Sequence, residues 1–157
     1  MFEAEKRAGE LAEEKFVQLF KNNGFTVNKT DYKDDKYNHF DYTVEKDGDI
    51  KKIEVKAAKK DDRNDAKPSF EITWIELKGI KGYSGWLYGK ADYFAFEQKD
   101  GFILSTRKDI VELILRKLVD NNFERGKSVY QIYNREGRED ILVKILFDDL
   151  ENKIYVK

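Results

Sequence analysis

Three residues in the first half of the chain have side chains that could together hold a metal ion and activate water. They are Asp41, Glu54 and Lys56, in the segments HFDYTVE and KIEVKA. Two carboxylates are hard oxygen ligands of the kind that Mg²⁺ and Mn²⁺ prefer, and these ions keep water molecules that a substrate can replace. A lysine beside such an ion could orient a water molecule or stabilise charge on a phosphate oxygen.

The segments that carry these residues are predicted to form a β-hairpin. Residues 39–45 and 52–57 alternate polar and apolar side chains, and Asp47-Gly48 lies between them. Asp-Gly favours a two-residue type I′ turn, which places Asp41 opposite Glu54. One face of the hairpin is then predicted to be buried, with Phe40, Tyr42, Val44, Ile53, Val55 and Ala57. The other face is predicted to carry His39, Asp41, Thr43, Lys52, Glu54 and Lys56.

This register brings two negative charges close together. Directly opposed residues have β-carbons about 4.5–5.5 Å apart. At an effective dielectric constant of about 20, the repulsion is on the order of 3 kcal/mol. Protonation of one acid, rotation of the side chains or a bound cation between them would relieve it. From these residues alone, a solvated polar strand face with an incidental acid pair is an equal alternative.

The order of the predicted elements indicates an α/β (α+β) fold with a mixed central β-sheet flanked by helices. Residues 3–22 repeat apolar side chains at helical spacing, and Asn23-Gly24 ends that helix. A second helix is expected after Thr106. The chain of 157 residues is long enough for one domain, with a core motif region at 1–60. Strands are predicted at 25–27, 39–45, 52–57, 69–75, 92–97 and 102–105, and further strands over 129–157.

Composition excludes several classes of function. The chain has no cysteine, which excludes disulfide frameworks and thiolate metal sites. It has one histidine. Its formal net charge of −1 excludes nucleic-acid binding through bulk positive charge alone. No apolar run is long enough to span a membrane, so we expect a cytoplasmic protein with no membrane partner.

The motif residues resemble the PD-(D/E)xK nuclease superfamily. An acid on one strand followed by Glu-X-Lys on the next is the signature of that superfamily, and here it is Asp41 with Glu54-Val55-Lys56. The segment RAGELA around Glu10 is similar to the first helix of archaeal Holliday junction resolvases and related phage nucleases. The resemblance covers about the first 60 residues, and Phe40 stands where the nominal proline would be.

The resemblance implies a restriction-endonuclease-like core and Mg²⁺-dependent hydrolysis of DNA phosphodiester bonds. Asp41, Glu54 and the main-chain carbonyl of Val55 would bind Mg²⁺, for which Mn²⁺ could substitute. Glu10 would contribute directly or through a water molecule, and Lys56 would place the attacking water. No organic cofactor is required. The resolvase-like helix implies selectivity for branched or junction DNA and therefore a homodimer with two active sites.

Two further segments are candidates for contacts with nucleic acid. Lys59, Lys60 and Arg63 lie in a stretch, residues 51–67, with seven positive and four negative side chains, and could contact phosphates. An ordinary solvated loop is equally consistent with this stretch. Aromatic residues among lysines at 79–90 suit stacking on unpaired bases. For these residues, Tyr83, Trp86 and Tyr88, we favour packing against the core or against a dimer partner.

Other functions stay open at this point. The chain could be a catalytically inactive nuclease-fold module that binds nucleic acid, or an RNA-cleaving or restriction-like member of the same superfamily. It could also be a structural protein whose hairpin acids are incidental. Dependence of cleavage, binding and stability on divalent ions distinguishes these possibilities.

Overall fold

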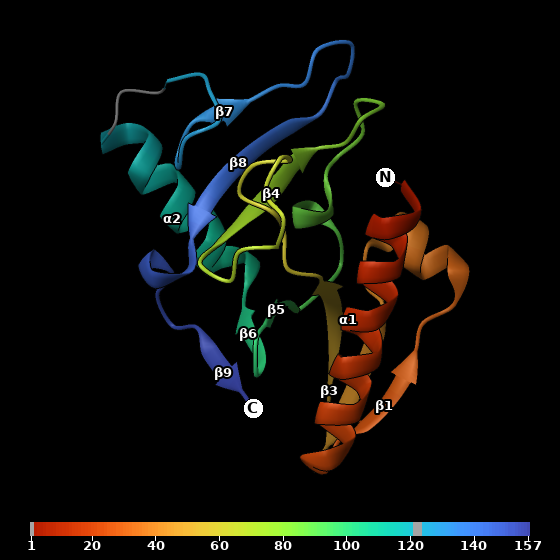
Figure 1. The fold of residues 1–157 in the computed structure, drawn as a ribbon. Coiled ribbons are helices and arrows are strands. Elements are labelled where there is room, and N and C mark those ends of the chain that lie inside the picture. Colours follow the sequence, from red (N-terminus) through yellow and green to blue (C-terminus); the bar gives the residue numbers. More distant parts are fainter. Residues whose placement is uncertain (1, 121–123) are drawn as a thin grey trace. The chain divides into compact units, whose positions relative to one another are not determined.

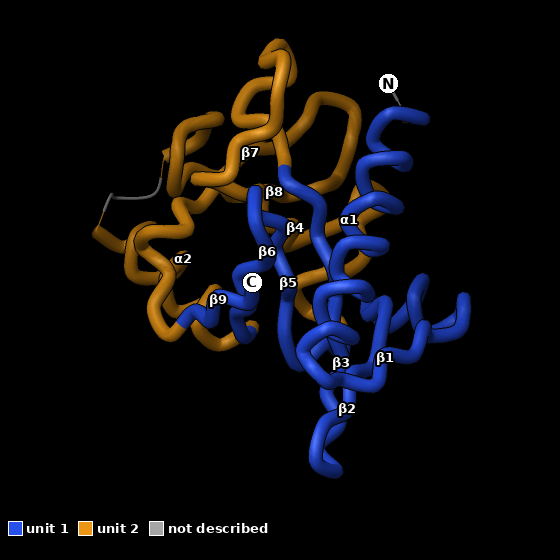
Figure 2. The backbone as a smooth tube through the Cα atoms, turned by 60° about the horizontal axis from the view of Figure 1, so that its bottom comes forward, with its two compact units in different colours: residues 1–58, 90–106, 153–157 blue, residues 59–89, 107–152 orange. Residues whose placement is uncertain are grey.

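The computed structural model describes residues 2–120 and 124–157. It has the predicted α+β class, with one mixed six-stranded sheet, one three-stranded sheet and helices. The chain divides into two compact units, each made of segments distant in sequence (Figure 2). Unit 1 comprises residues 1–58, 90–106 and 153–157, and unit 2 comprises residues 59–89 and 107–152.

Unit 1 contains the six-stranded sheet, whose spatial order is β1-β2-β3-β5-β6-β9 (Figure 1). The pair β3–β5 is parallel, and every other neighbouring pair is antiparallel. The sheet is therefore mixed, as predicted. Its strands are β1 (Thr26–Lys29), β2 (Tyr42–Lys46), β3 (Asp49–Lys56), β5 (Tyr93–Gln98), β6 (Gly101–Ser105) and β9 (Ile154–Val156).

Helix α1 (Phe2–Asn22) packs its apolar face on this sheet. The helix matches the predicted range and ends before Gly24, which has a left-handed backbone with φ +86°. Phe16 is fully buried, stacks on Phe20 at 4.3 Å and meets Phe102 edge-on at 5.6 Å between ring centroids. This aromatic cluster joins α1 to β6 of the same sheet.

The β2–β3 hairpin has the predicted register. Tyr42 pairs with Ile53 and Lys46 pairs with Asp49. The two turn residues, Asp47 and Gly48, have φ angles of +54° and +80°, as a type I′ turn requires. The local turn chemistry therefore set the alignment of both strands.

The predicted alternation fails at the open end of the hairpin. His39 has a left-handed backbone with φ +54°, and the N–H of Asp41 donates to the Ile53 carbonyl at 2.8 Å, outside the regular ladder. The prediction that Phe40 shares the core face with Tyr42 was wrong. Phe40 is buried, but it lies outside the core cluster, and its ring is 5.4 Å from the Lys52 ammonium group.

Unit 2 contains an antiparallel three-stranded sheet of order β4-β8-β7. Ile75, Val143 and Ile145 of this sheet are fully buried. Helix α2 follows Thr106 as predicted, whereas β4 begins three residues later than the sequence pattern indicated. The elements are β4 (Ile72–Lys78), η2 (Trp86–Tyr88), α2 (Arg107–Asp120), β7 (Ile132–Tyr133), β8 (Ile141–Leu146) and η3 (Phe147–Asp149).

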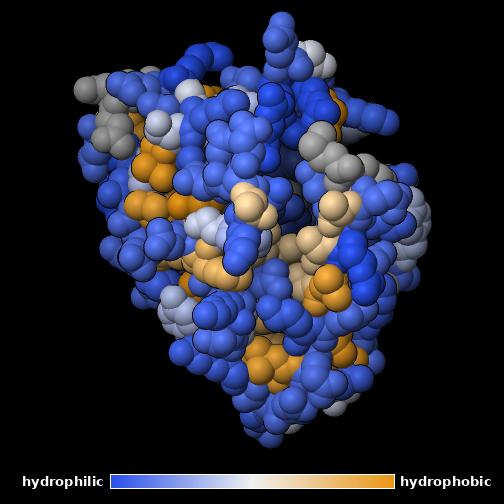
Figure 3. Space-filling model, in the orientation of Figure 1, coloured by the Kyte–Doolittle hydropathy of each residue, from blue (hydrophilic) through white to orange (hydrophobic). Residues whose placement is uncertain are grey.

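The surface is largely hydrophilic on the face shown in Figure 3, with separate apolar patches. This agrees with a chain in which 39% of the residues are charged. Within the residues that the structure describes, no helix is both long and apolar enough to cross a membrane.

Candidate active site

The structure brings Asp41 and Glu54 together at the open end of the β2–β3 hairpin. Asp41 is 7% exposed and Glu54 is 5% exposed, so both carboxyl groups are removed from bulk water. The two carboxyl groups are close enough that Glu54 raises the pKa of Asp41. The N–H of Val55 donates to Asp41 Oδ2 at 2.7 Å. Burial of two acids in contact is costly, which makes this pair the strongest candidate for a site with chemistry.

The main chain holds Asp41 from both sides. Its N–H donates to the Ile53 carbonyl at 2.8 Å, and its own carbonyl accepts the Thr30 N–H at 2.9 Å. The Thr30 hydroxyl donates to the same carbonyl at 2.9 Å. Asp41 is therefore positioned by β3 and by the residue that follows β1, before any ligand binds.

Burial raises the pKa of Asp41 to about 10, and the negative charge of Glu54 acts in the same direction. Hydrogen bonds with Glu54 and Asp35 raise the pKa further, while the Val55 N–H opposes the shift. Asp41 consequently keeps its proton at neutral pH when no cation is bound. A divalent ion could replace that proton, because it stabilises both carboxylates at once.

Asp35 is a third acid at this site, and sequence reasoning missed it. It lies in the π-helical turn η1 (Asp34–Asn38), where the sequence indicated only a polar loop. Within the turn, the Asn38 side-chain amide donates to Asp34 Oδ1 at 2.6 Å. No sequence spacing links Asp35 to the motif of Asp41, Glu54 and Lys56. Asp35 acts on Asp41 because the η1 turn folds back toward that residue.

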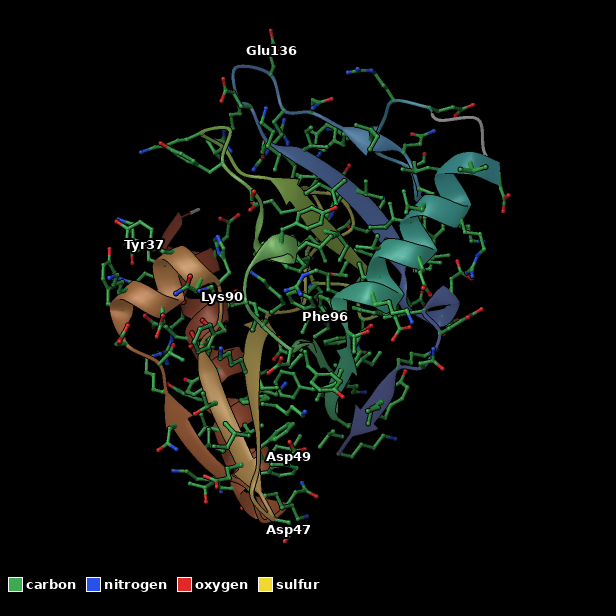
Figure 4. The ribbon with its side chains drawn as sticks, turned by 180° about the vertical axis from the view of Figure 1, so that it is seen from behind. Tyr37, Asp47, Asp49, Lys90, Phe96 and Glu136 are labelled. Carbon is green, nitrogen blue, oxygen red and sulfur yellow. The ribbon has the colours of Figure 1, made fainter. Side chains whose placement is uncertain are left out.

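Lys56 stands beside Glu54, with its Nζ 3.9 Å from Glu54 Oε1. The Lys56 side chain is 22% exposed. On the neighbouring strand, Glu54 pairs with Phe94 and Lys56 pairs with Phe96, which is labelled in Figure 4. Both phenylalanines are buried. The apolar rings lower the local dielectric constant, which strengthens the interaction between the lysine and the acids.

Glu10 occupies an exposed position on α1. Its carboxylate lies 3.7 Å from Arg7, and the contacts described for Asp41 and Glu54 do not include it. Glu13, one turn further along α1, binds Lys29 at 3.2 Å, and the Lys29 ammonium group lies 5.0 Å from the Tyr42 ring. Glu10, Glu13, Lys29 and Tyr42 line one cavity of about 480 Å³.

Lys29 connects this cavity electrostatically to the acid pair. Burial is the largest single influence and lowers the pKa of Lys29, but the charge and hydrogen bond of Glu13, with Tyr42 and Asp41, together outweigh it. The pKa of Lys29 is raised as a result. Lys29 and Glu13 are therefore neighbours of the candidate site that the sequence motifs did not single out.

The predicted phosphate-binding residues belong to unit 2. Lys59, Lys60 and Arg63 are exposed, and they lie on a loop. The carbonyl of Lys59 accepts the Ser69 N–H at 2.8 Å, and that of Lys60 accepts the Trp74 indole N–H at 3.3 Å. These bonds fix the loop backbone and leave the cationic side chains at the surface.

The aromatic residues of 79–90 have different environments. Trp86 is buried, as the packing interpretation predicted. Tyr83 and Tyr88 are exposed, so they do not pack against the core of the chain.

The donor set at the Asp41–Glu54 pair fits Mg²⁺. This ion is usually held by one or two carboxylates, with water and substrate phosphate as the remaining ligands. Two buried carboxyl groups would supply the protein ligands of such a site. Among the described residues, no group of three or more His, Cys, Asp or Glu side chains that could hold a metal ion is found.

Comparisons with known proteins add no relative to this picture. No family model matches the chain, and neither a curated protein nor a solved structure matches it. The interpretation of the site therefore depends on its residues and their geometry.

Proposed function

We propose that the protein is a metal-dependent endonuclease that hydrolyses DNA phosphodiester bonds. The observation that carries the proposal is the buried pair of Asp41 and Glu54, with the Lys56 ammonium group 3.9 Å from Glu54. Burial of two acids beside a lysine lowers the stability of the fold. Such a cluster is therefore typical of a site that binds a ligand or carries out a reaction.

Each residue has a distinct role in the proposal. Asp41, Glu54 and the Val55 carbonyl would hold Mg²⁺ or Mn²⁺, and the bound ion would supply a more acidic water molecule and polarise the phosphate. Lys56 would orient the attacking water and stabilise the charge that develops on the phosphate. The exposed position of Glu10 favours contact through water over direct binding.

The substrate and the assembly are the less specific part of the proposal. The resemblance of the first helix to that of junction resolvases supports branched or junction DNA and a homodimer. Lys59, Lys60 and Arg63 are exposed and could contact phosphates. RNA cleavage and restriction-like cleavage of duplex DNA use the same site chemistry and are tested by the choice of substrate.

The test is cleavage of labelled branched, duplex and single-stranded substrates in Mg²⁺, Mn²⁺ or EDTA. Glu54→Gln and Lys56→Ala should each reduce metal-dependent cleavage by about 10²-fold or more. Lys51→Ala is the matched control, because Lys51 is on the same strand and pairs with exposed Asp49 at 3.3 Å. Equal activity of all variants would show that the nuclease activity comes from another site or from a contaminant.

A binding module without turnover is the second candidate. The raised pKa of Asp41 favours it, because a proton held by that carboxyl group relieves the repulsion within the acid pair with no metal at all. Such a protein would bind nucleic acid equally in Mg²⁺ and in EDTA. It would not cleave with Mg²⁺ or with Mn²⁺. Its thermal stability would also not change when Mg²⁺ is added.

A further inference from the structure

We propose that Tyr32, Lys36 and Tyr37 form a stacking platform for an unpaired base beside the acid pair. This inference builds on the proposed function and adds a substrate class: nucleic acid with at least one unpaired nucleotide next to the cleaved bond. We call these three residues the tyrosine platform. All of them belong to unit 1, as do Asp41 and Glu54.

The two tyrosines are exposed and share one cation. Tyr32 is 75% exposed and Tyr37 is 65% exposed. The Lys36 ammonium group lies 5.7 Å from the Tyr32 ring and 5.3 Å from the Tyr37 ring, within the range of cation–π attraction. Figure 4 shows Tyr37 on the outer side of the η1 turn, where a base could approach its ring.

The turn that carries the platform is joined to the acid pair. The loop that carries the platform runs from Thr30 to Asp41, and its two ends are joined, because the Thr30 N–H donates to the Asp41 carbonyl at 2.9 Å. At the start of the turn, Asp31 Oδ1 accepts the Asp34 N–H at 2.8 Å. At its end, the Asn38 carbonyl accepts the Lys90 N–H at 2.7 Å. These bonds fix the platform relative to the site, so a strand bound at Asp41 has its next nucleotides near the rings.

The charge of the segment selects bases over phosphates. Residues 31–38 contain three aspartates and two lysines, so the segment has a net negative charge. A surface of this sign repels the phosphates of a duplex, whereas uncharged bases can stack on tyrosine rings without that penalty. Because bases inside a duplex are already stacked on each other, unpaired bases are the ones with both faces free to use the platform.

The experiment measures binding without cleavage. A fluorescein-labelled duplex with a single-stranded tail and a blunt duplex of the same length are titrated with protein in EDTA, and fluorescence anisotropy gives each Kd. The variant Tyr32→Ala/Tyr37→Ala should bind the tailed duplex at least about tenfold more weakly and change blunt-duplex binding less than about twofold. Tyr32→Phe/Tyr37→Phe should keep the wild-type preference, because it keeps both rings.

Tyr155→Ala is the control for loss of an exposed tyrosine, since Tyr155 is 53% exposed in β9 of the same unit. It should leave both Kd values unchanged. Equal weakening of tailed and blunt binding in the double alanine variant would overturn the platform, and so would an unchanged preference. A wild-type protein that binds neither DNA would overturn it as well and would direct attention to a protein partner.

The failure of the platform can be told apart from the failure of the nuclease proposal. Lys51→Ala should bind the tailed duplex as the wild type does, because Lys51 belongs neither to the platform nor to the proposed site and instead pairs with exposed Asp49. If the wild-type protein does not cleave with any ion but the double alanine variant still loses tailed binding, the platform stands and the nuclease proposal fails. If cleavage depends on metal and the preference for tails survives the double substitution, the nuclease proposal stands and the platform fails.

Discussion

Replacing Asp41 with asparagine should stabilise the metal-free protein, and the gain should increase with pH. Burial, Glu54 and Asp35 raise the pKa of Asp41 from 3.8 to about 10 in the folded protein. The unfolded chain releases this proton near its ordinary pKa. Between the two values the folded state binds more protons than the unfolded state, so the free energy of unfolding falls as pH rises.

The pH dependence of the free energy of unfolding follows from the one proton that the folded protein keeps on Asp41 and the unfolded chain releases. Stability changes by about 1.4 kcal/mol per pH unit across this window, or about 2.7 kcal/mol between pH 5 and pH 7. Asparagine at position 41 does not titrate, and its amide oxygen can still accept the Val55 N–H. We therefore expect Asp41→Asn to gain at least about 1 kcal/mol over the wild type between pH 5 and pH 7.

The assay is urea unfolding followed by circular dichroism in EDTA at several pH values from 5 to 8. Asp49→Asn is the matched control, because Asp49 lies at the turn end of the same hairpin and its side chain is 69% exposed (Figure 4). The control should stay within about 0.5 kcal/mol of the wild type. A difference between Asp41→Asn and the wild type that does not change with pH would refute the reasoning, since it would mean that Asp41 is ionised in the folded protein.

Three further substitutions test the core, unit 2 and the site. Phe16→Ala should lower the free energy of unfolding by about 3–5 kcal/mol in urea titrations, because Phe16 is fully buried among aromatic rings. Arg135→Met should cost about 3–5 kcal/mol in the same assay, because it leaves the fully buried Asp140 without its partner; a change below 1 kcal/mol would mean that the pair is dispensable. Glu10→Gln should reduce metal-dependent cleavage less than about tenfold, against about 10²-fold or more for Glu54→Gln, and equal losses would show that Glu10 binds the metal directly.

The sequence determined the local elements of this protein. Helix α1 and the β2–β3 hairpin lie where periodicity and the Asp-Gly turn placed them. In both cases the interactions that set the element join residues close in the chain, and a type I′ turn permits one register. The meeting of Asp41 and Glu54 follows from that register, although the ladder breaks at Asp41 itself.

The tertiary structure decided which distant segments meet. The parallel pairing of β3 with β5 and the return of β9 to the edge beside β6 join strands that are far apart in the sequence. The influence of Asp35 on the pKa of Asp41 also depends on such contacts. Polar residues 31–38 carry no periodic pattern, so only packing and hydrogen bonds made after folding could place this third acid and the two tyrosines beside the site. The Asp-Gly turn and the residues beside it were enough to predict the hairpin. Long-range contacts supplied the burial that raises the pKa of Asp41.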